Sequence, residues 1–232
     1  MSSHQPLIKS LAAQVAPVKA LINPDLLAIL WLLGSVIYCL TVIHLFGAIR
    51  SNAYSQLITE PRFMLEMLVG LTAIVLTSVV AFRHTVPGAV SRPAKMAASI
   101  VVLFWIGLNI YGLFDPAIEP SSEGYRHYCA YEIFLYALAP LFIAGLLARR
   151  RLALELTNTG FGLGLAAGMI PAWYMQMACM YSPEHMLRFH LLPAIAVAGA
   201  AVLLFKSKGL LVFFRHKKMP INLIKRFDRH FK

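Results

Sequence analysis

Six long apolar runs alternate along the chain with short polar segments, and each run is long enough to cross a bilayer as a helix. Their approximate bounds are residues 26–49, 63–82, 96–114, 128–147, 160–181 and 187–205. Helix-terminating residues separate them, among them Asn23, Pro24 and Pro61. The pattern predicts an all-α polytopic membrane protein with six transmembrane helices.

Short polar segments flank the six runs at both ends of the chain. Residues 1–24 contain apolar positions at helical spacing, which predicts a cytoplasmic N-terminal segment with a short amphipathic helix. Residues 25–207 form the predicted six-helix transmembrane domain. Residues 208–232 mix apolar and basic side chains, as a cytoplasmic or interfacial tail on anionic lipid does.

The positive charges indicate how the helices are oriented. Of the 21 Lys and Arg residues, 17 fall in segments that share a side with both termini. The four on the other side are Arg50, Arg62, Arg126 and Arg188. Because positive residues concentrate in cytoplasmic loops, both termini are predicted to lie in the cytoplasm.

Composition agrees with a membrane protein, with 59% hydrophobic and 13% charged residues and a mean hydropathy of +0.70. The net charge of +11 could suggest nucleic-acid binding, but the basic residues flank apolar runs, where they record membrane orientation. The bilayer is therefore the expected partner, and no direct contact with nucleic acid is expected.

The fifth run carries Gly160, Gly164, Gly168 and Ala172, one small residue every fourth position. This spacing predicts a flat face for close approach of a neighbouring helix. Steps of four and three continue the face to Gln176 and Cys179, so Cys179 is expected to point into the bundle.

Polar side chains of four runs gather at the outer end of the predicted bundle. An ionisable group within a span is costly, so such groups are usually paired and are candidates for function. The candidates are Arg62, Glu66, His127, Cys129, Glu132, Cys179, His185, Arg188 and His190.

Three interpretations of this outer cluster stay open. In the first, Arg62 pairs with Glu66 and Glu132 with Arg188 to fix helix packing, while the cysteines act as small apolar residues. In the second, the two thiols form a disulfide at an oxidising outer face. In the third, the two thiolates bind a divalent heavy-metal ion, with His127 or His190 and a carboxylate as further ligands. The metal-ligand candidates are Cys129, Cys179 and His190.

The other polar positions and the known sequence motifs give less information about function. Cys39 lies in the middle of the first run and is expected to be a buried packing residue, and His44 a helix-contact histidine. C-x-x-C, H-E-x-x-H and phosphate-loop motifs are all missing from the sequence, so no enzyme class and no resident cofactor is predicted.

Five short motifs together resemble the NrsF-like family, the negative regulators of sigma F. They are L-A-A-Q-V-A-P-V-K-A-L at residues 11–21, E-P-R-F-M-L-E at 60–66, V-P-G at 86–88, Y-C-A-Y-E at 128–132 and A-C-M-Y-S-P-E-H at 178–185. The resemblance covers roughly residues 7–207, and the basic tail departs from the family pattern.

The resemblance implies a multi-pass anti-sigma factor of the bacterial inner membrane. Such a protein holds an extracytoplasmic-function sigma factor inactive at the cytoplasmic side and releases it under periplasmic heavy-metal or oxidative stress. By motif position, Cys129 and Cys179 would be the sensor thiols. We hypothesise that the sigma factor contacts residues 1–22 and 83–95, with contact candidates Leu7, Leu11, Val15, Arg83 and Arg92.

The alternative function is a small membrane transporter, or a membrane oxidoreductase that depends on thiols or a metal. Against a transporter, the middle of the predicted bundle lacks the charged residues of a proton-coupled pathway. In its favour, Pro140, Pro171 and Pro193 could break helices, as transporter helices often are broken.

Overall fold

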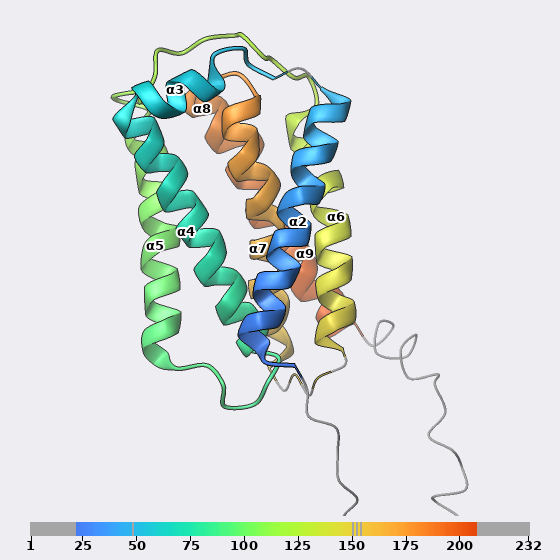
Figure 1. Cartoon of the computed structure of the whole chain (residues 1–232). Coiled ribbons are helices and arrows are strands. Elements are labelled where there is room, and N and C mark those ends of the chain that lie inside the picture. The colour runs from blue at the N-terminus through green and yellow to red at the C-terminus, as the bar shows by residue number, and fades with distance from the viewer. Residues whose placement is uncertain (1–21, 48, 150, 152, 154, 208–232) are drawn as a thin grey trace, which may run out of the picture.

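The computed structural model describes residues 22–47, 49–149, 151, 153 and 155–207, and that part of the chain is a helical bundle without β-strands (Figure 1). The elements are α2 (Pro24–Phe46), α3 (Ala53–Thr59), α4 (Pro61–Arg83), α5 (Arg92–Tyr111), α6 (Cys129–Ala148), α7 (Leu156–Ala178), α8 (Pro183–Met186), the π-helix η1 (Leu187–Leu191) and α9 (Leu192–Lys206). The last three follow one another without a break.

Five helical segments are long and apolar enough to span a membrane: α2, α4, α5, α6 and the continuous segment Pro183–Lys206. They correspond to five of the six predicted spans, and they make this a membrane protein. The sixth prediction falls on α7, which has 23 residues, but Gly and Ala outnumber Leu and Ile in it. Its crossing of the membrane stays a prediction.

Helix α7 occupies the centre of the bundle, with α2, α4, α6 and α9 packed around it. A Cβ atom added at Gly164 would lie 2.5 Å from the Cβ of Ala201, and one at Gly168 would lie 2.8 Å from the carbonyl oxygen of Ala194. Only glycine permits such close approach of the backbones of α7 and α9, which confirms the small-residue face. A low hydropathy suits α7, because its neighbours shield it from lipid.

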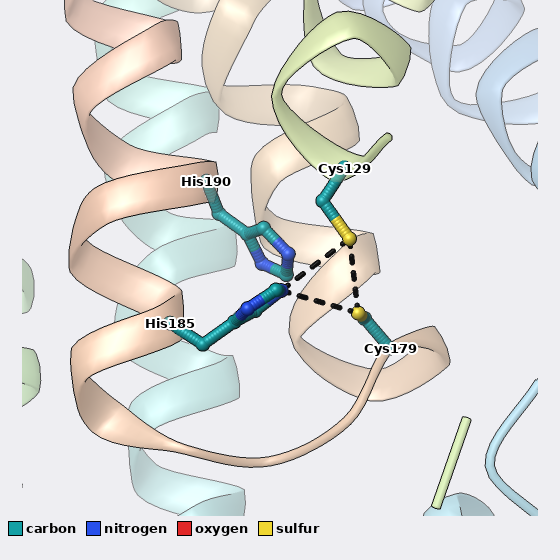
Figure 2. A group of neighbouring side chains, drawn as sticks. All are labelled: Cys129, Cys179, His185 and His190. Atoms are coloured by element: carbon teal, nitrogen blue, oxygen red, sulfur yellow. Dashed lines mark hydrogen bonds between the residues drawn. The ribbon is translucent and has the colours of Figure 1, made fainter. Parts of the chain in front are cut away.

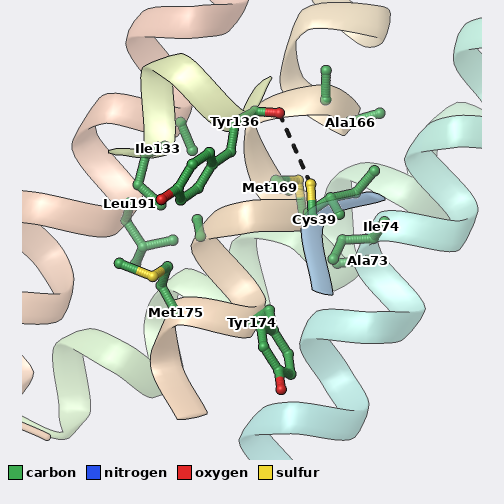
Figure 3. Close-up of a cluster of buried hydrophobic side chains, with 14 of the residues drawn as sticks. Cys39, Ala73, Ile74, Ile133, Tyr136, Ala166, Met169, Tyr174, Met175 and Leu191 are labelled. Atoms are coloured by element: carbon green, nitrogen blue, oxygen red, sulfur yellow. Dashed lines mark hydrogen bonds between the residues drawn. The ribbon is translucent and has the colours of Figure 1, made fainter. Parts of the chain in front are cut away.

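Prolines lie inside two of the helices, and at Pro140 another helix supplies a donor in place of the missing one. Pro140 lies within α6 and has no N–H for the carbonyl oxygen of Tyr136. The Sγ of Cys39 lies 3.9 Å from that oxygen and donates to it (Figure 3). Cys39 is 1% exposed, so its predicted role as a packing residue is confirmed. Pro171 likewise lies inside α7.

Two features of the ends of the bundle differ from the sequence prediction. The short helix α3 was not predicted, because its seven residues are too few for a clear periodic pattern. The second predicted run ends at Phe82, whereas α4 ends at Arg83. The Arg83 guanidinium donates to both carboxylate oxygens of Asp25 at 2.6 and 2.7 Å and so ties α4 to α2. In Figure 1, α2 begins and α9 ends at this same end of the bundle.

Candidate functional site

Two cysteines and two histidines converge at the end of the bundle opposite Arg83 (Figure 2). The Sγ atoms of Cys129 and Cys179 are 3.1 Å apart. The Nε2 atom of His185 lies 3.3 Å from the first sulfur and 3.4 Å from the second. With one ring nitrogen of His190, these atoms all lie within 4.8 Å of one another. We call these four residues the thiol–imidazole cluster.

Separate elements bring the four side chains of the thiol–imidazole cluster together. Cys129 is the first residue of α6, and Cys179 follows the last residue of α7. His185 belongs to α8 and His190 to η1. Cys129, Cys179 and His190 are buried, whereas His185 is partly exposed. The cluster is therefore close to the surface but largely closed to bulk water.

The π-helix η1 explains how His185 and His190 meet. In an α-helix of 3.6 residues per turn, residues five apart are rotated by about 140° from each other. A π-helix hydrogen-bonds residues five apart, and its wider turn brings such residues to one side. Pro193 favours the interruption, since it lacks the N–H that an α-helix would direct to the carbonyl of Phe189. The two imidazole rings are 5.1 Å apart between centroids.

The connection between α7 and α8 is held from two sides. Its Ala178 carbonyl accepts from the N–H of Arg50 at 3.1 Å. Its Tyr181 carbonyl accepts from the N–H of Ser121 at 3.0 Å. Gly124, with φ +77°, lets the long α5–α6 loop pass close to the Ala178 carbonyl at the end of α7. Cys179 is thus attached to both outer loops.

Aromatic rings and a cation cover the base of this connection. The guanidinium of Arg50, 2% exposed as a residue, lies 5.6 Å from the ring of Phe63 and 5.7 Å from that of Tyr181. Burial raises the pKa of Tyr181 to about 12, so its hydroxyl stays neutral. That hydroxyl accepts from the N–H of Ala117 at 3.0 Å, which anchors the loop further.

An ion pair lies next to the cluster, but it is not the one that was predicted. Glu132 accepts from Arg126 at 2.9 Å, and a second nitrogen of the same guanidinium donates to the carbonyl of Ile43. The predicted pair of Glu132 with Arg188 is wrong, because Arg188 lies on the exposed side of η1 and pairs with Glu184 at 2.9 Å. Sequence reasoning missed the partner, since Arg126 lies in a loop without periodicity.

The remaining predicted residues lie outside the cluster. Glu66 is buried and accepts from Gln176 at 3.0 Å. Arg62 is 4.0 Å from Glu66 but pairs more closely, at 2.5 Å, with Asp115. His127 is exposed and packs edge-on against a tyrosine ring, so it is not brought to the thiols. The single predicted polar cluster is therefore divided: four of its nine residues form the thiol–imidazole cluster, and the other five have partners of their own.

The donor set suits a borderline or soft divalent cation. Zinc sites of two cysteines and two histidines are tetrahedral, with metal–sulfur distances of about 2.3 Å and metal–nitrogen distances of about 2.0–2.1 Å. Tetrahedral geometry then requires the two sulfurs to be about 3.7 Å apart, against 3.1 Å here. Binding such an ion would therefore require the two sulfurs to move apart by about half an ångström. His185 was not among the predicted ligands, because only the π turn aligns it with His190.

Of the predicted sigma-factor contacts, Arg83 and Arg92 lie at the other end of the bundle. Leu7, Leu11 and Val15 fall outside the described residues. Arg83 is engaged with Asp25, whereas Arg92 is exposed at the start of α5.

His44, predicted as a helix-contact histidine, forms a hydrogen bond with the hydroxyl of Tyr174 at 2.5 Å.

Comparison with protein families identifies a family for this chain. The family model for negative regulators of sigma F, NrsF, matches residues 11–207. The chain belongs to this family. No curated protein and no solved structure matches the sequence. The NrsF assignment indicates a regulator with a sigma factor as its partner, and the predicted resemblance is confirmed.

Proposed function

We propose that this NrsF-family protein is an anti-sigma factor of the bacterial inner membrane that holds an extracytoplasmic-function sigma factor at its cytoplasmic face. A heavy-metal ion bound by the thiol–imidazole cluster on the periplasmic side would release the sigma factor. The observation that carries the sensing role is the convergence of four ligand atoms within 4.8 Å. The family match supports the sigma-factor partner. The protein acts by binding and is not an enzyme.

The charge distribution supports the orientation in this proposal. The cluster lies at the end of the bundle that carries Arg50, Arg62, Arg126 and Arg188, four of the 21 basic residues. The other 17 lie in segments predicted to share a side with the termini. Under the positive-inside rule, the end of the bundle opposite the cluster then faces the cytoplasm. With α7 counted as a span, six crossings put both termini on one side.

Metal binding would change the packing of α6 against α7. The ion displaces the thiol protons and draws ligands from α6, from the end of α7 and from the α8–η1 segment. A signal requires that the ion bind one arrangement of these helices more tightly than another. Each tenfold difference in affinity supplies about 1.4 kcal/mol toward the favoured arrangement. Since α7 runs the length of the bundle, a shift at Cys179 moves the end that faces the sigma factor.

A second way to trigger the switch is oxidation. The two sulfurs are 3.1 Å apart, so a disulfide needs only about 1 Å of approach. With hydrogen peroxide as the oxidant, two S–H bonds are broken, one S–S bond forms, and the peroxide takes two electrons and two protons to give two waters. The same pair of thiols thus supports response to either stress.

Metal binding can be tested with Co²⁺, whose absorption reports tetrahedral sulfur coordination. We expect the purified protein to bind one Co²⁺ per chain with thiolate charge-transfer bands, and Cys179→Ser to lose them. Cys39→Ser is the matched control, because it removes the third thiol without touching the cluster. His185→Ala and His190→Ala should each weaken binding by more than the roughly 10–100-fold typical of outer-shell changes. Equal binding by Cys179→Ser and Cys39→Ser would exclude the site.

The partner surface needs a separate test. Membranes from cells that produce the protein with a tagged sigma factor should yield both proteins in one affinity step. Deletion of residues 1–22 should reduce recovery of the sigma factor, and Arg92→Glu should reduce it further. Lys206→Glu, a basic residue at the end of α9, is the control for charge alone. Undiminished recovery after the deletion would remove the N-terminal segment from the proposal.

A further inference from the structure

A groove opens on the side of the bundle between α5 and α7, far from the thiol–imidazole cluster. Its floor is the face of α4 that carries Thr77, Val80 and His84. Residues from Lys95 to Ile106 of α5 form one wall, and α7 forms the other with Phe161 among its residues. The groove has a volume of about 480 Å³ and a mostly apolar lining. That volume lies in the range of about 300–1,000 Å³ typical of ligand pockets.

The length and position of the groove match one leaflet of a bilayer. Lys95 and Ile106 are eleven residues apart on α5, which corresponds to about 16 Å along a helix. Half of a hydrocarbon core of about 30 Å is about 15 Å. The groove therefore runs from the membrane surface at the α4–α5 loop to about the middle of the bilayer. Its length is about that of the acyl chains of one leaflet. Helix α5 lies at the edge of the bundle (Figure 1).

A polar pocket of about 160 Å³ continues the groove at the membrane surface. His84, Lys95 and Glu155 line it, and the first two also line the groove. Glu155 is already engaged, since it accepts from Asn158 at 2.6 Å and lies 3.4 Å from the Nδ1 of His84. Asn158 and Lys95 hold the pKa of Glu155 below its usual range.

Lys95 is the lysine of this pocket, and its charge attracts Glu155 without a close contact. Its ammonium group forms no hydrogen bond or ion pair within the part of the chain that the structure describes, although it is half-buried. It lies in the first turn of α5, where the helix dipole adds positive potential, and the exposed Arg92 is one turn away. With Arg92, Lys95 brings two positive charges to this end of the groove against the single carboxylate of Glu155, so the local charge favours an anion.

We propose that the groove binds one anionic glycerophospholipid. One acyl chain lies between α5 and α7, and the phosphate lies against Lys95 at the end that the proposed orientation places in the cytoplasm. The site is distinct from the thiol–imidazole cluster and does not depend on the sigma factor. It gives the membrane's anionic lipid a defined contact with α7 and with α5, the helix that follows the α4–α5 loop.

Native mass spectrometry of the full chain tests the proposal, with phosphatidylglycerol and phosphatidylcholine of the same acyl chains added in equal amounts. We expect one phosphatidylglycerol to be retained in preference. Lys95→Gln should lower that preference about fivefold, the effect expected for one lysine near an anionic lipid surface. Ser99→Phe, which fills the groove from an exposed position, should lower retention of both lipids.

Two substitutions serve as controls. Lys206→Gln removes a basic residue at the same end of the bundle outside the groove, and Ile100→Phe enlarges an exposed residue of α5 that does not line it. Both should behave as the unchanged protein. Equal retention of the two lipids, or an unchanged preference in Lys95→Gln, would overturn the proposal. A dimer that Ser99→Phe abolishes would overturn it too, since a second copy would then occupy the groove.

Discussion

The close packing of α7 on α9 sets the position of the thiol–imidazole cluster, and Gly164→Ala probes it. The added Cβ would lie 2.5 Å from the Cβ of Ala201 and 2.9 Å from the Cα of Ala198, so the two helices must separate. Overpacking of this kind typically costs about 1–3 kcal/mol. Gly199→Ala, on the exposed side of α9, is the matched control, because nothing lies within 4 Å of the added atom. Both changes gain the same helix propensity, so it cancels in the comparison.

Unfolding by titration with dodecyl sulfate in mixed micelles, followed by circular dichroism, measures the difference. We expect Gly164→Ala to be less stable than Gly199→Ala by about 1–3 kcal/mol. Ala201→Gly removes the closest clash, so the double variant should be more stable than the sum of the single effects by about 1 kcal/mol. A difference between the two alanine variants below about 0.5 kcal/mol would refute the close approach of the helices.

Three further predictions concern the surroundings of the cluster. Arg126→Met leaves Glu132 without its partner and should destabilise the protein by about 3 kcal/mol. This is the lower end of the range for broken buried pairs, because the carboxylate is 18% exposed. The same titration measures the loss of stability, and adding Glu132→Gln should restore most of that stability. Tyr174→Phe removes the hydroxyl that bonds two side chains and should cost about 1 kcal/mol by that titration. Hydrogen bonds from Ser51 lower the pKa of Glu123, in the α5–α6 loop, from its usual 4.5. The stabilisation of this loop by Glu123 is therefore complete above pH 4.5 and is lost as pH falls through the lowered pKa. Hydrogen exchange of the Ser51 amide should differ between the protein and Glu123→Gln at pH 7 but not in acid.

Sequence reasoning succeeded where a pattern repeats along one helix. The apolar runs predicted α2, α4, α5, α6 and α9, and the spacing of glycines predicted the face of α7 that meets its neighbour. It also placed the two outer thiols on adjoining helices, and their sulfurs are 3.1 Å apart.

It failed where partners lie far apart in the chain or where a helix departs from regular geometry. The pairing of Glu132 with Arg126 depends on the path of the α5–α6 loop, which has no periodic signal. The alignment of His185 with His190 depends on a π turn, whereas an α-helical projection separates residues at this spacing. Both errors concern tertiary contacts that local propensity does not determine.

The most direct test of the proposed switch is release of the sigma factor by metal. Membranes that hold the complex are titrated with Cd²⁺, chosen as a soft ion for thiolate ligands, and the sigma factor left on the membrane is measured. We predict release at about one ion per chain from the unchanged protein and from Cys39→Ser, and retention in Cys129→Ser and Cys179→Ser. Release from the latter two variants at the same Cd²⁺ concentration, or saturation of the cluster without release, would contradict the proposed function.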